Sequence, residues 1–170
     1  MAIPSYSHSL QTERREQGME KKEPRASDPP MEKQKGDARQ VSSTVILVVD
    51  DDKMQRDILK TILSDEGYEA HGASSAEEAL EAAQTLKPDV VLTDLRLDRM
   101  DGMELMKQLR SQADAPEVLI MSAFGTPHII EESARKGAFS FMQKPLEKNQ
   151  VLFTIKQALE ITARIKNQYL

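Results

Sequence analysis

Apolar residues beyond the first quarter of the chain alternate between short continuous runs and helix-spaced positions. The runs Val45–Val49, Val90–Thr93 and Val118–Met121 have the length and the apolar content of buried strands. Two shorter runs, Tyr68–His71 and Phe139–Met142, indicate a second and a fifth strand. Because near-continuous apolar runs are typical of strands covered on both faces, these segments predict a parallel sheet.

Helix-spaced apolar residues lie between the strands. The first helix places Ile58, Leu59, Ile62 and Leu63 on one face and ends at Gly67. The second helix ends before Pro88, and its start is a capping box made either by Ser74 with Glu77 or by Ser75 with Glu78. The pattern therefore indicates a helix after each of the first two strands.

The second half of the chain continues the alternation. A third helix spans Met103 to Arg110, and a fourth begins at Thr126-Pro127 and ends at Gly137. The last helix starts near Glu147 and extends toward the C-terminus. Strands alternating with helices predict an α/β fold, a five-stranded parallel sheet with helices on both faces and right-handed crossovers.

Residues 1–42 differ from this pattern, because they hold four of the eight prolines, mixed charges and few large apolar residues. Such a segment buries too little surface to offset its ordering entropy, so we expect a disordered N-terminal extension. Residues 43–160 form the predicted domain. Residues 161–170 are either a projecting end of the last helix, which frays or pairs with a second copy, or a linker.

Composition narrows the class of protein. The chain has no Cys, and its net charge is -5. No apolar run approaches the roughly 20 residues that a membrane span needs, and the N-terminus has no apolar stretch of the kind found in signal peptides. We therefore expect a cytoplasmic protein that does not insert into a membrane. An acidic domain is also a poor nucleic-acid binder, so we expect no direct nucleic-acid binding by this chain.

Polar residues follow the strands at the sheet edge where ligands bind in such folds. Asp50 and Asp51 follow the first strand, Asp94 ends the third, Ser122 ends the fourth, and Lys144 follows the fifth. Three carboxylates at one edge repel one another, and a divalent cation relieves that repulsion. Oxygen ligands without His or Cys favour Mg²⁺. A carboxylate beside Mg²⁺ and Lys144 is a plausible nucleophile toward phosphorus.

These residues also carry a family resemblance. The segments Val-Val-Asp50-Asp51-Asp52, Leu-Thr-Asp94-Leu, Met100-Asp101-Gly102, Met-Ser122-Ala, Gly137-Ala138-Phe139 and Lys144-Pro145 resemble the receiver domain of bacterial two-component response regulators. The resemblance covers roughly residues 44–165. It implies a flavodoxin-like fold, whose sheet has the strand order 2-1-3-4-5.

The resemblance implies a role for each site residue. Asp94 is the phosphoacceptor, Asp51 binds Mg²⁺ directly, and Asp50 acts mainly through a metal-bound water. The backbone carbonyl of Arg96 is a further metal ligand, and Lys144 pairs with the phosphate.

The resemblance also implies two residues that transmit the phosphorylation. The Ser122 hydroxyl turns toward the phosphate, and Phe141 is the switch aromatic that moves inward with it. One departure from the family is Asp98, where Pro is usual, which leaves the metal site more negative. In the other, Phe141 has no hydroxyl, so switching there rests on packing.

Finer details of the sequence resemble receivers of enhancer-binding, nitrogen-regulator-type transcriptional activators: Ala-Phe-Gly-Thr126, Pro145-Leu-Glu and the long last helix. The P-loop signature of their ATPase domain does not occur in this sequence. The implied partners are a sensor histidine kinase and a second copy, through the face of the fourth helix, fifth strand and fifth helix. Control of transcription would then run through an output domain or partner outside this sequence.

Two alternatives stay open beside the phosphorylation switch. One is a degenerate receiver that binds partners without phosphate, against which the complete set of acids, hydroxyl and amine argues. The other is a phosphatase working through an aspartyl phosphate, but those enzymes resemble Asp-x-Asp, and Arg96 stands at the second position. We therefore expect a signalling switch and not an enzyme, apart from its own phosphorylation and dephosphorylation.

Overall fold

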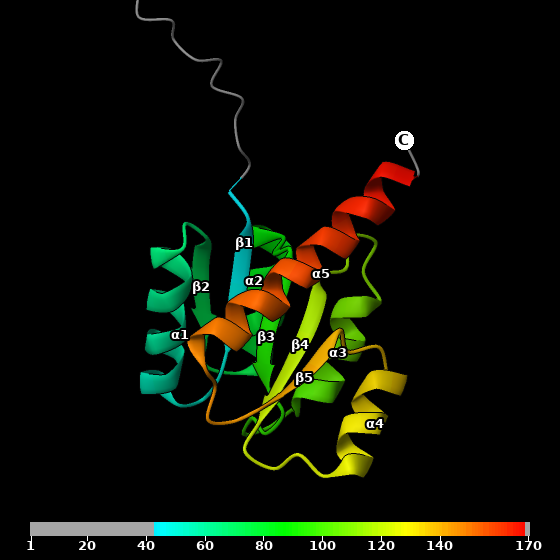
Figure 1. The fold of residues 1–170 in the computed structure, drawn as a ribbon. Helices are drawn as coiled ribbons and strands as arrows, with labels where there is room; N and C mark the ends of the chain where they lie inside the picture. Colours follow the sequence, from blue (N-terminus) through cyan, green and yellow to red (C-terminus); the bar gives the residue numbers. More distant parts are fainter. Residues whose placement is uncertain (1–42, 169–170) are drawn as a thin grey trace, which may run out of the picture. The chain divides into compact units, whose positions relative to one another are not determined.

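The computed structural model describes residues 43–168, with side chains through Arg164. A parallel sheet of order β2-β1-β3-β4-β5 lies at its centre (Figure 1), which confirms the predicted strand order. The strands are β1 (Val45–Val49), β2 (Glu69–Ala73), β3 (Val90–Asp94), β4 (Glu117–Ser122) and β5 (Ser140–Gln143). The helices are α1 (Lys53–Asp65), α2 (Ala76–Leu86), α3 (Gly102–Arg110), α4 (Pro127–Arg135) and α5 (Lys148–Gln168).

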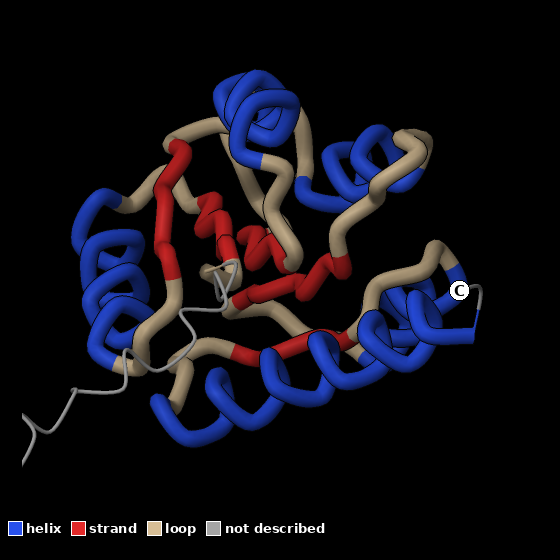
Figure 2. The backbone as a smooth tube through the Cα atoms, turned by 90° about the horizontal axis from the view of Figure 1, so that it is seen from above, coloured by secondary structure: helices blue, strands red, loops and turns tan. Residues whose placement is uncertain are grey.

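Helices cover both faces of the sheet, as Figure 2 shows in a view along the layers. On one face α1 and α5 bury Leu59, Leu63, Val151 and Ile155 against the strands. The opposite face is covered by α2 and α3, and α4 lies beside them. Because consecutive residues of a strand point to opposite faces, each apolar strand supplies both cores, as the sequence pattern predicted.

Two strands are shifted along the chain from their predicted ranges. β2 begins at Glu69 and continues through Gly72 and Ala73, because these two residues pair with Val48 and Val49 of β1. The small residues have no strand preference of their own, so the neighbouring strand determines the conformation there. β5 likewise lies one residue further along the chain than its apolar run suggested.

The helix starts agree with the capping residues. Ser75 caps α2 by accepting the Glu78 amide, but the Glu78 carboxylate accepts the amide and hydroxyl of Ser74, so the predicted box of Ser75 and Glu78 holds only in its first half. Thr126 caps α4 by accepting the Ile129 amide. Asp52 caps α1 by accepting the amides of Met54 and Gln55.

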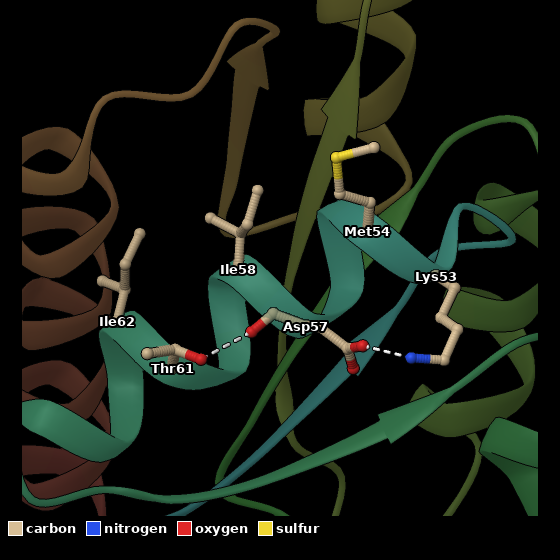
Figure 3. Close-up of a pocket in the computed structure, with 6 residues that line it drawn as sticks. All are labelled: Lys53, Met54, Asp57, Ile58, Thr61 and Ile62. Carbon is tan, nitrogen blue, oxygen red and sulfur yellow. Dashed lines mark hydrogen bonds and ion pairs between the residues drawn. The ribbon is translucent and has the colours of Figure 1, made fainter.

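The apolar face of α1 was predicted too broadly. Leu59 and Leu63 are buried, but Ile58 is 53% exposed, and Met54 is 70% exposed one turn earlier. Figure 3 shows Met54, Ile58 and Ile62 along one side of the helix, away from the ion pair between Lys53 and Asp57. Periodicity alone cannot separate a side chain that packs on the sheet from its neighbour one position around the helix.

The expectations for residues 1–42 lie outside the described residues. At the other end of the chain, α5 continues as one helix to Gln168, and its last turns extend beyond the sheet in Figure 1. None of the helices described between residues 43 and 168 combines the length and the hydropathy needed to span a membrane.

Candidate functional site

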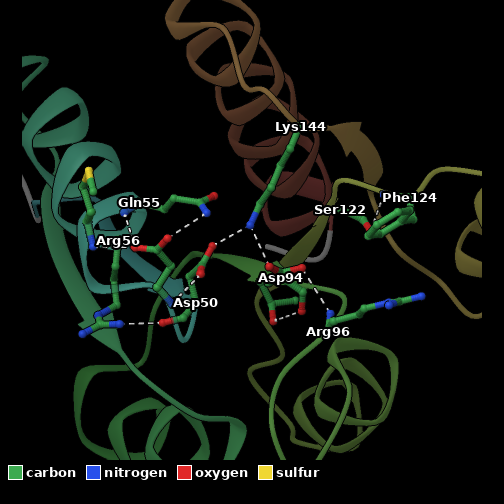
Figure 4. Close-up of polar contacts among 11 residues, drawn as sticks. Asp50, Gln55, Arg56, Asp94, Arg96, Ser122, Phe124 and Lys144 are labelled. Carbon is green, nitrogen blue, oxygen red and sulfur yellow. Dashed lines mark hydrogen bonds and ion pairs between the residues drawn. The ribbon is translucent and has the colours of Figure 1, made fainter.

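The carboxyl ends of four strands bring the predicted polar residues together (Figure 4). The Nζ of Lys144 donates to Oδ2 of Asp50 at 2.8 Å and to Oδ2 of Asp94 at 2.6 Å. These contacts join residues at the ends of β1, β3 and β5. In the sheet, β1 and β3 are neighbours, and β4 lies between β3 and β5. The side chains of Asp50, Asp94 and Lys144 are 0%, 14% and 12% exposed, so the ion-paired cluster is largely shielded from water.

Backbone hydrogen bonds fix the strand ends that carry these side chains. The Lys144 amide donates to the Ser122 carbonyl at 2.8 Å, and the Leu95 amide donates to the Met121 carbonyl at 2.8 Å. The hydrogen bonding of the sheet thus continues one residue past the last residues of β3 and β5.

Asp51 completes an acidic group with Asp50 and Asp94. One carboxylate oxygen from each of the three lies within 4.8 Å of the others. Oxygens that share one octahedral Mg²⁺ are about 3 Å apart when adjacent and about 4.2 Å apart when opposite. The three carboxylates therefore need little movement to bind one ion, and their hard oxygen donors fit Mg²⁺ or a similar cation. This part of the chain thus has an acidic site that could hold a metal.

Burial affects the charges of the site unequally. Burial raises the pKa of Asp50 above its ordinary value, and the hydrogen bonds from Lys144 and from the Asp52 amide oppose this only in part. Burial also disfavours the charge of Lys144, but its hydrogen bonds to Asp50 and Asp94 outweigh that effect and raise the pKa of Lys144. Lys144 is therefore a cation at neutral pH, whereas Asp50 bears a desolvation cost that a bound divalent cation would relieve.

Ser122 and Phe141 lie on the two strands next to the acidic group. Ser122 is buried, and its Oγ accepts the backbone N–H of Phe124 at 3.1 Å. Phe141 is half-buried in β5, and its ring contacts Gly125 so closely that a Cβ added there would lie 2.9 Å from Cε1. Both residues therefore contact the β4–α4 loop, Ser122 through a hydrogen bond and Phe141 through packing.

Arg96 follows Asp94 in the β3–α3 loop. Its backbone N–H donates to Oδ1 of Asp94 at 3.1 Å, which orients the carboxylate. Its guanidinium carbon lies 4.7 Å from the centre of the Phe124 ring. The side chain of Arg96 therefore points toward the β4–α4 loop, while its backbone N–H orients the Asp94 carboxylate.

Sequence reasoning missed the roles of two residues beside the site. The guanidinium of Arg56 donates to the backbone carbonyl of Asp50 at 2.6 Å, and no sequence motif marks that position. At Gly102, an added Cβ would lie 2.3 Å from the carbonyl oxygen of Asp94. Gly102 is therefore required for the close approach of α3 to the end of β3, a role that the Met-Asp-Gly motif marks but does not explain.

Comparison with known proteins agrees with this geometry. The sequence profile of the response regulator receiver domain matches residues 46–156. The regulatory protein AtoC of Escherichia coli is 33% identical over 71% of this chain, and the match spans 26% of AtoC. Sporulation initiation phosphotransferase F of Bacillus subtilis is 32% identical over 68% of this chain and 94% of its own length. Thus the chain spans about a quarter of the AtoC-like regulators but nearly all of a single-domain relative.

Solved structures show the same likeness. A CheY-like receiver domain from Methanospirillum hungatei superposes with a TM-score of 0.68 at 28% identity, over 72% of this chain and 98% of that one. NtrX from Brucella abortus superposes with a TM-score of 0.67 at 34% identity, over 74% of this chain and 28% of that one. Enhancer-binding regulators and CheY-like receivers are thus both among its relatives. Receiver domains are phosphorylated by histidine kinases, and this chain belongs to the response-regulator receiver family.

Proposed function

We propose that Asp94 accepts a phosphoryl group from a sensor histidine kinase in a reaction that requires Mg²⁺. The observation that carries this proposal is the cluster of Asp94, Lys144 and the two acids after β1. The Asp94 carboxylate attacks phosphorus, the bond from phosphorus to the donor breaks, and an aspartyl phosphate forms. The donor histidine leaves as its neutral imidazole once it has taken up a proton.

The neighbouring residues of the site are suited to this transfer. Phosphoryl transfer depends on positioning and on neutralising the transferred oxygens. Lys144 already contacts Asp94 and would pair with a phosphate oxygen. Mg²⁺ held by Asp51, Asp94 and the Arg96 carbonyl, with Asp50 acting through a water, would neutralise the others. The Arg96 amide keeps the attacking carboxylate oriented.

The β4–α4 loop would change position when Asp94 is phosphorylated. The Ser122 hydroxyl, whose Oγ accepts the Phe124 amide in this structure, would turn toward a phosphate oxygen and donate to it. Phe141 packs on the same loop at Gly125, so a shift of the loop changes the space available to its ring. A phosphate that favours one loop position therefore shifts the population of two states.

The output would be a changed contact of the face formed by α4, β5 and α5. β5 is an edge strand, and the flanking helices expose Ile130, Phe153 and Ile161 by 41%, 62% and 42%. Apolar side chains at an edge of the sheet favour association with a second copy or a partner domain. Control of transcription through an output domain or partner is proposed from the enhancer-binding relatives.

The kinase would reach Asp94 over the start of α1. A groove beside the site is lined by Ile58 and Ile62 of α1 and by Lys144, Pro145 and Leu146. Together with the exposed Met54, this surface offers apolar contacts next to the acceptor. We place the protein in the cytoplasm, with no membrane or nucleic-acid contact of its own, and regard it as a switch and not a metabolic enzyme.

Incubation with acetyl phosphate and Mg²⁺, followed by intact mass measurement, tests the proposal. We expect an adduct of about 80 Da, one phosphoryl group, in the unaltered chain. Asp94→Asn should abolish the adduct, whereas Asp98→Asn, an exposed acid of the same loop, should retain it. Absence of the adduct from the unaltered chain would favour a phosphate-independent binding module, and rapid turnover of phosphomonoesters would favour a phosphatase.

A further inference from the structure

Arg56 is a half-buried cation that contacts the acidic group through its backbone. From the start of α1, its Nη1 donates to the carbonyl oxygen of Asp50 at 2.6 Å. Side chains of an α-helix lean toward its N-terminus, so an arginine at this position can reach back to the end of β1. In Figure 4, Arg56 and Lys144 reach Asp50 from opposite sides. One cation thus holds the carboxylate of Asp50, and another holds its backbone.

The path of the Arg56 side chain is defined by β2 and α2. Its stem passes over Gly72 of β2, where an added Cβ would lie 3.2 Å from both Cγ and Cδ of Arg56. Hydrogen bonds from Ser74 hold the pKa of Glu78 below its ordinary value, and the charge of Arg56 contributes to this lowering. The stem therefore lies against Gly72, while the Glu78 carboxylate attracts the guanidinium.

All four polar groups of Asp50 have a hydrogen-bond partner. The partners of its amide, its carbonyl, Oδ1 and Oδ2 are, in that order, Ala73, Arg56, the Asp52 amide and Lys144. Asp51, by contrast, is exposed, and its place in the acidic group depends on the backbone that carries it. Because a peptide unit is planar, a hydrogen bond to the Asp50 carbonyl fixes the plane from which Asp51 departs.

These contacts give Arg56 a role toward the metal that it does not itself touch. Resting on the proposed Mg²⁺-dependent phosphorylation of Asp94, we propose that Arg56 is a positioning residue of the metal site. By holding the Asp50 carbonyl, it keeps the Asp51 carboxylate directed toward Asp94 before an ion binds. The acidic group is then already arranged for Mg²⁺, and the ion does not have to order the β1–α1 loop.

Position and charge predict opposite effects of removing Arg56. A cation close to the site repels Mg²⁺, so loss of the charge alone would strengthen Mg²⁺ binding. Loss of an outer partner that orients the ligands of a metal weakens binding, by about 10- to 100-fold in metal sites generally. The direction of the change in Mg²⁺ affinity therefore separates a positioning residue from a nearby charge.

Calorimetric titration with Mg²⁺ tests the inference on three variants. Arg56→Met keeps the apolar stem but not the donor, and we expect it to bind Mg²⁺ about ten-fold more weakly, at the low end of that range. Arg56→Lys should recover part of the loss, because an ammonium can donate to the same carbonyl. Lys60→Met is the matched control, since Lys60 also lies against Gly72, with Cδ 3.0 Å from the added Cβ, and carries the same charge. It should bind Mg²⁺ no more weakly than the unaltered chain.

Amide hydrogen exchange, measured by NMR without Mg²⁺, reports on the loop itself. The Asp52 amide donates to Oδ1 of Asp50, so it should exchange several-fold faster in Arg56→Met than in the unaltered chain. The Ile129 amide, which donates to Thr126 at the start of α4, should exchange at the same rate in both and so exclude a general loss of stability.

The outcomes distinguish this inference from the proposed function. Mg²⁺ binding in Arg56→Met that is as tight as in the unaltered chain, or tighter, overturns the role of Arg56 and leaves the metal site standing. An equal loss in Lys60→Met, no recovery in Arg56→Lys or an unchanged Asp52 amide also overturns it. An unaltered chain that binds no Mg²⁺ would instead refute the proposed metal site, and the inference with it.

Discussion

The Nζ of Lys144 lies 2.6 Å from Oδ2 of Asp94 and 2.8 Å from Oδ2 of Asp50. One ammonium group therefore offsets part of the charge of two of the three acids of the proposed Mg²⁺ site. The amine and the metal are partial competitors for the same negative charge, because each relieves the repulsion that the other would relieve. This competition gives the first prediction.

Replacing Lys144 by Gln should strengthen Mg²⁺ binding several-fold while it weakens phosphorylation. Without the ammonium, Asp50 and Asp94 repel each other, so the metal-free protein should unfold at a lower temperature. Binding of Mg²⁺ should then relieve more repulsion than it does in the unaltered chain. Calorimetric titration with Mg²⁺ measures the affinity, and Lys148→Gln, which removes an exposed ion pair with Glu66, is the control. Unchanged or weaker Mg²⁺ binding in Lys144→Gln would show that the two cations do not share the acids.

Mg²⁺ should stabilise the fold through the acidic group. At a Mg²⁺ concentration about 100 times the dissociation constant, the free energy of unfolding should rise by about 2.7 kcal/mol, and a chelator should reverse the rise. Asp51→Asn should remove most of this gain, whereas Asp114→Asn, at the other end of the sheet, should keep it. Thermal unfolding with and without Mg²⁺ provides the comparison, and equal gains in the two variants would exclude Asp51 as a ligand.

The sequence predicted the fold well because strand and helix periods alternate clearly and the strand ends carry polar residues. Asp50, Asp94 and Lys144 could be placed at one edge because parallel strands all end there, whereas the strand order came from the family resemblance. The pairing of Lys144 with both acids could not be foreseen, because it depends on side-chain reach across the sheet edge. The exposure of Ile58 could not be predicted either, because it depends on how α1 packs against its neighbours and not on the spacing of apolar residues.

The contacts around the site residues were least accessible from the sequence. Arg56 reaches the Asp50 carbonyl, and Arg96 reaches Phe124, through long side chains with several rotamers. Neither contact leaves a pattern in the chain. The role of Gly102 was likewise hidden, because the need for glycine arises from the approach of α3 to the backbone of Asp94.

Gly102→Ala tests the close approach of α3 to Asp94, because its effect on stability should have the opposite sign from that of an ordinary Gly→Ala change in a helix. At an ordinary position within a helix, Ala in place of Gly stabilises by about 1 kcal/mol. Here the new Cβ would lie 2.3 Å from the Asp94 carbonyl oxygen, so the backbone must move. We expect a loss of about 1–3 kcal/mol of stability in urea unfolding, together with slower phosphorylation of Asp94. Stabilisation with normal phosphorylation would contradict the close approach.

Asp52 gives a prediction on pH dependence. Hydrogen bonds from the Gln55 side chain and from the amides of Gln55 and Met54 hold the pKa of Asp52 below its ordinary value. A carboxyl with a lowered pKa in the folded state stabilises the fold above its unfolded pKa, and this contribution is lost as the pH falls through the folded pKa. Asn also caps helices but does not titrate in this range.

The stability difference between the unaltered chain and Asp52→Asn should therefore shift in favour of the Asn variant between pH 7 and pH 3. Urea unfolding without Mg²⁺ at both pH values measures the difference, and the other carboxyl groups cancel because both proteins contain them. A difference that is independent of pH would show that the cap does not depend on the charge of Asp52.

Chemical trapping of the acceptor is the most direct test of the account. Borohydride reduces an acyl phosphate to an alcohol, so a phosphorylated Asp becomes homoserine, about 14 Da lighter, at the position that carried the phosphoryl group. After treatment with acetyl phosphate and Mg²⁺, the account predicts homoserine at residue 94, lost when Mg²⁺ is chelated. Homoserine at Asp51 or Asp101 instead of residue 94, or at no residue at all, would contradict it.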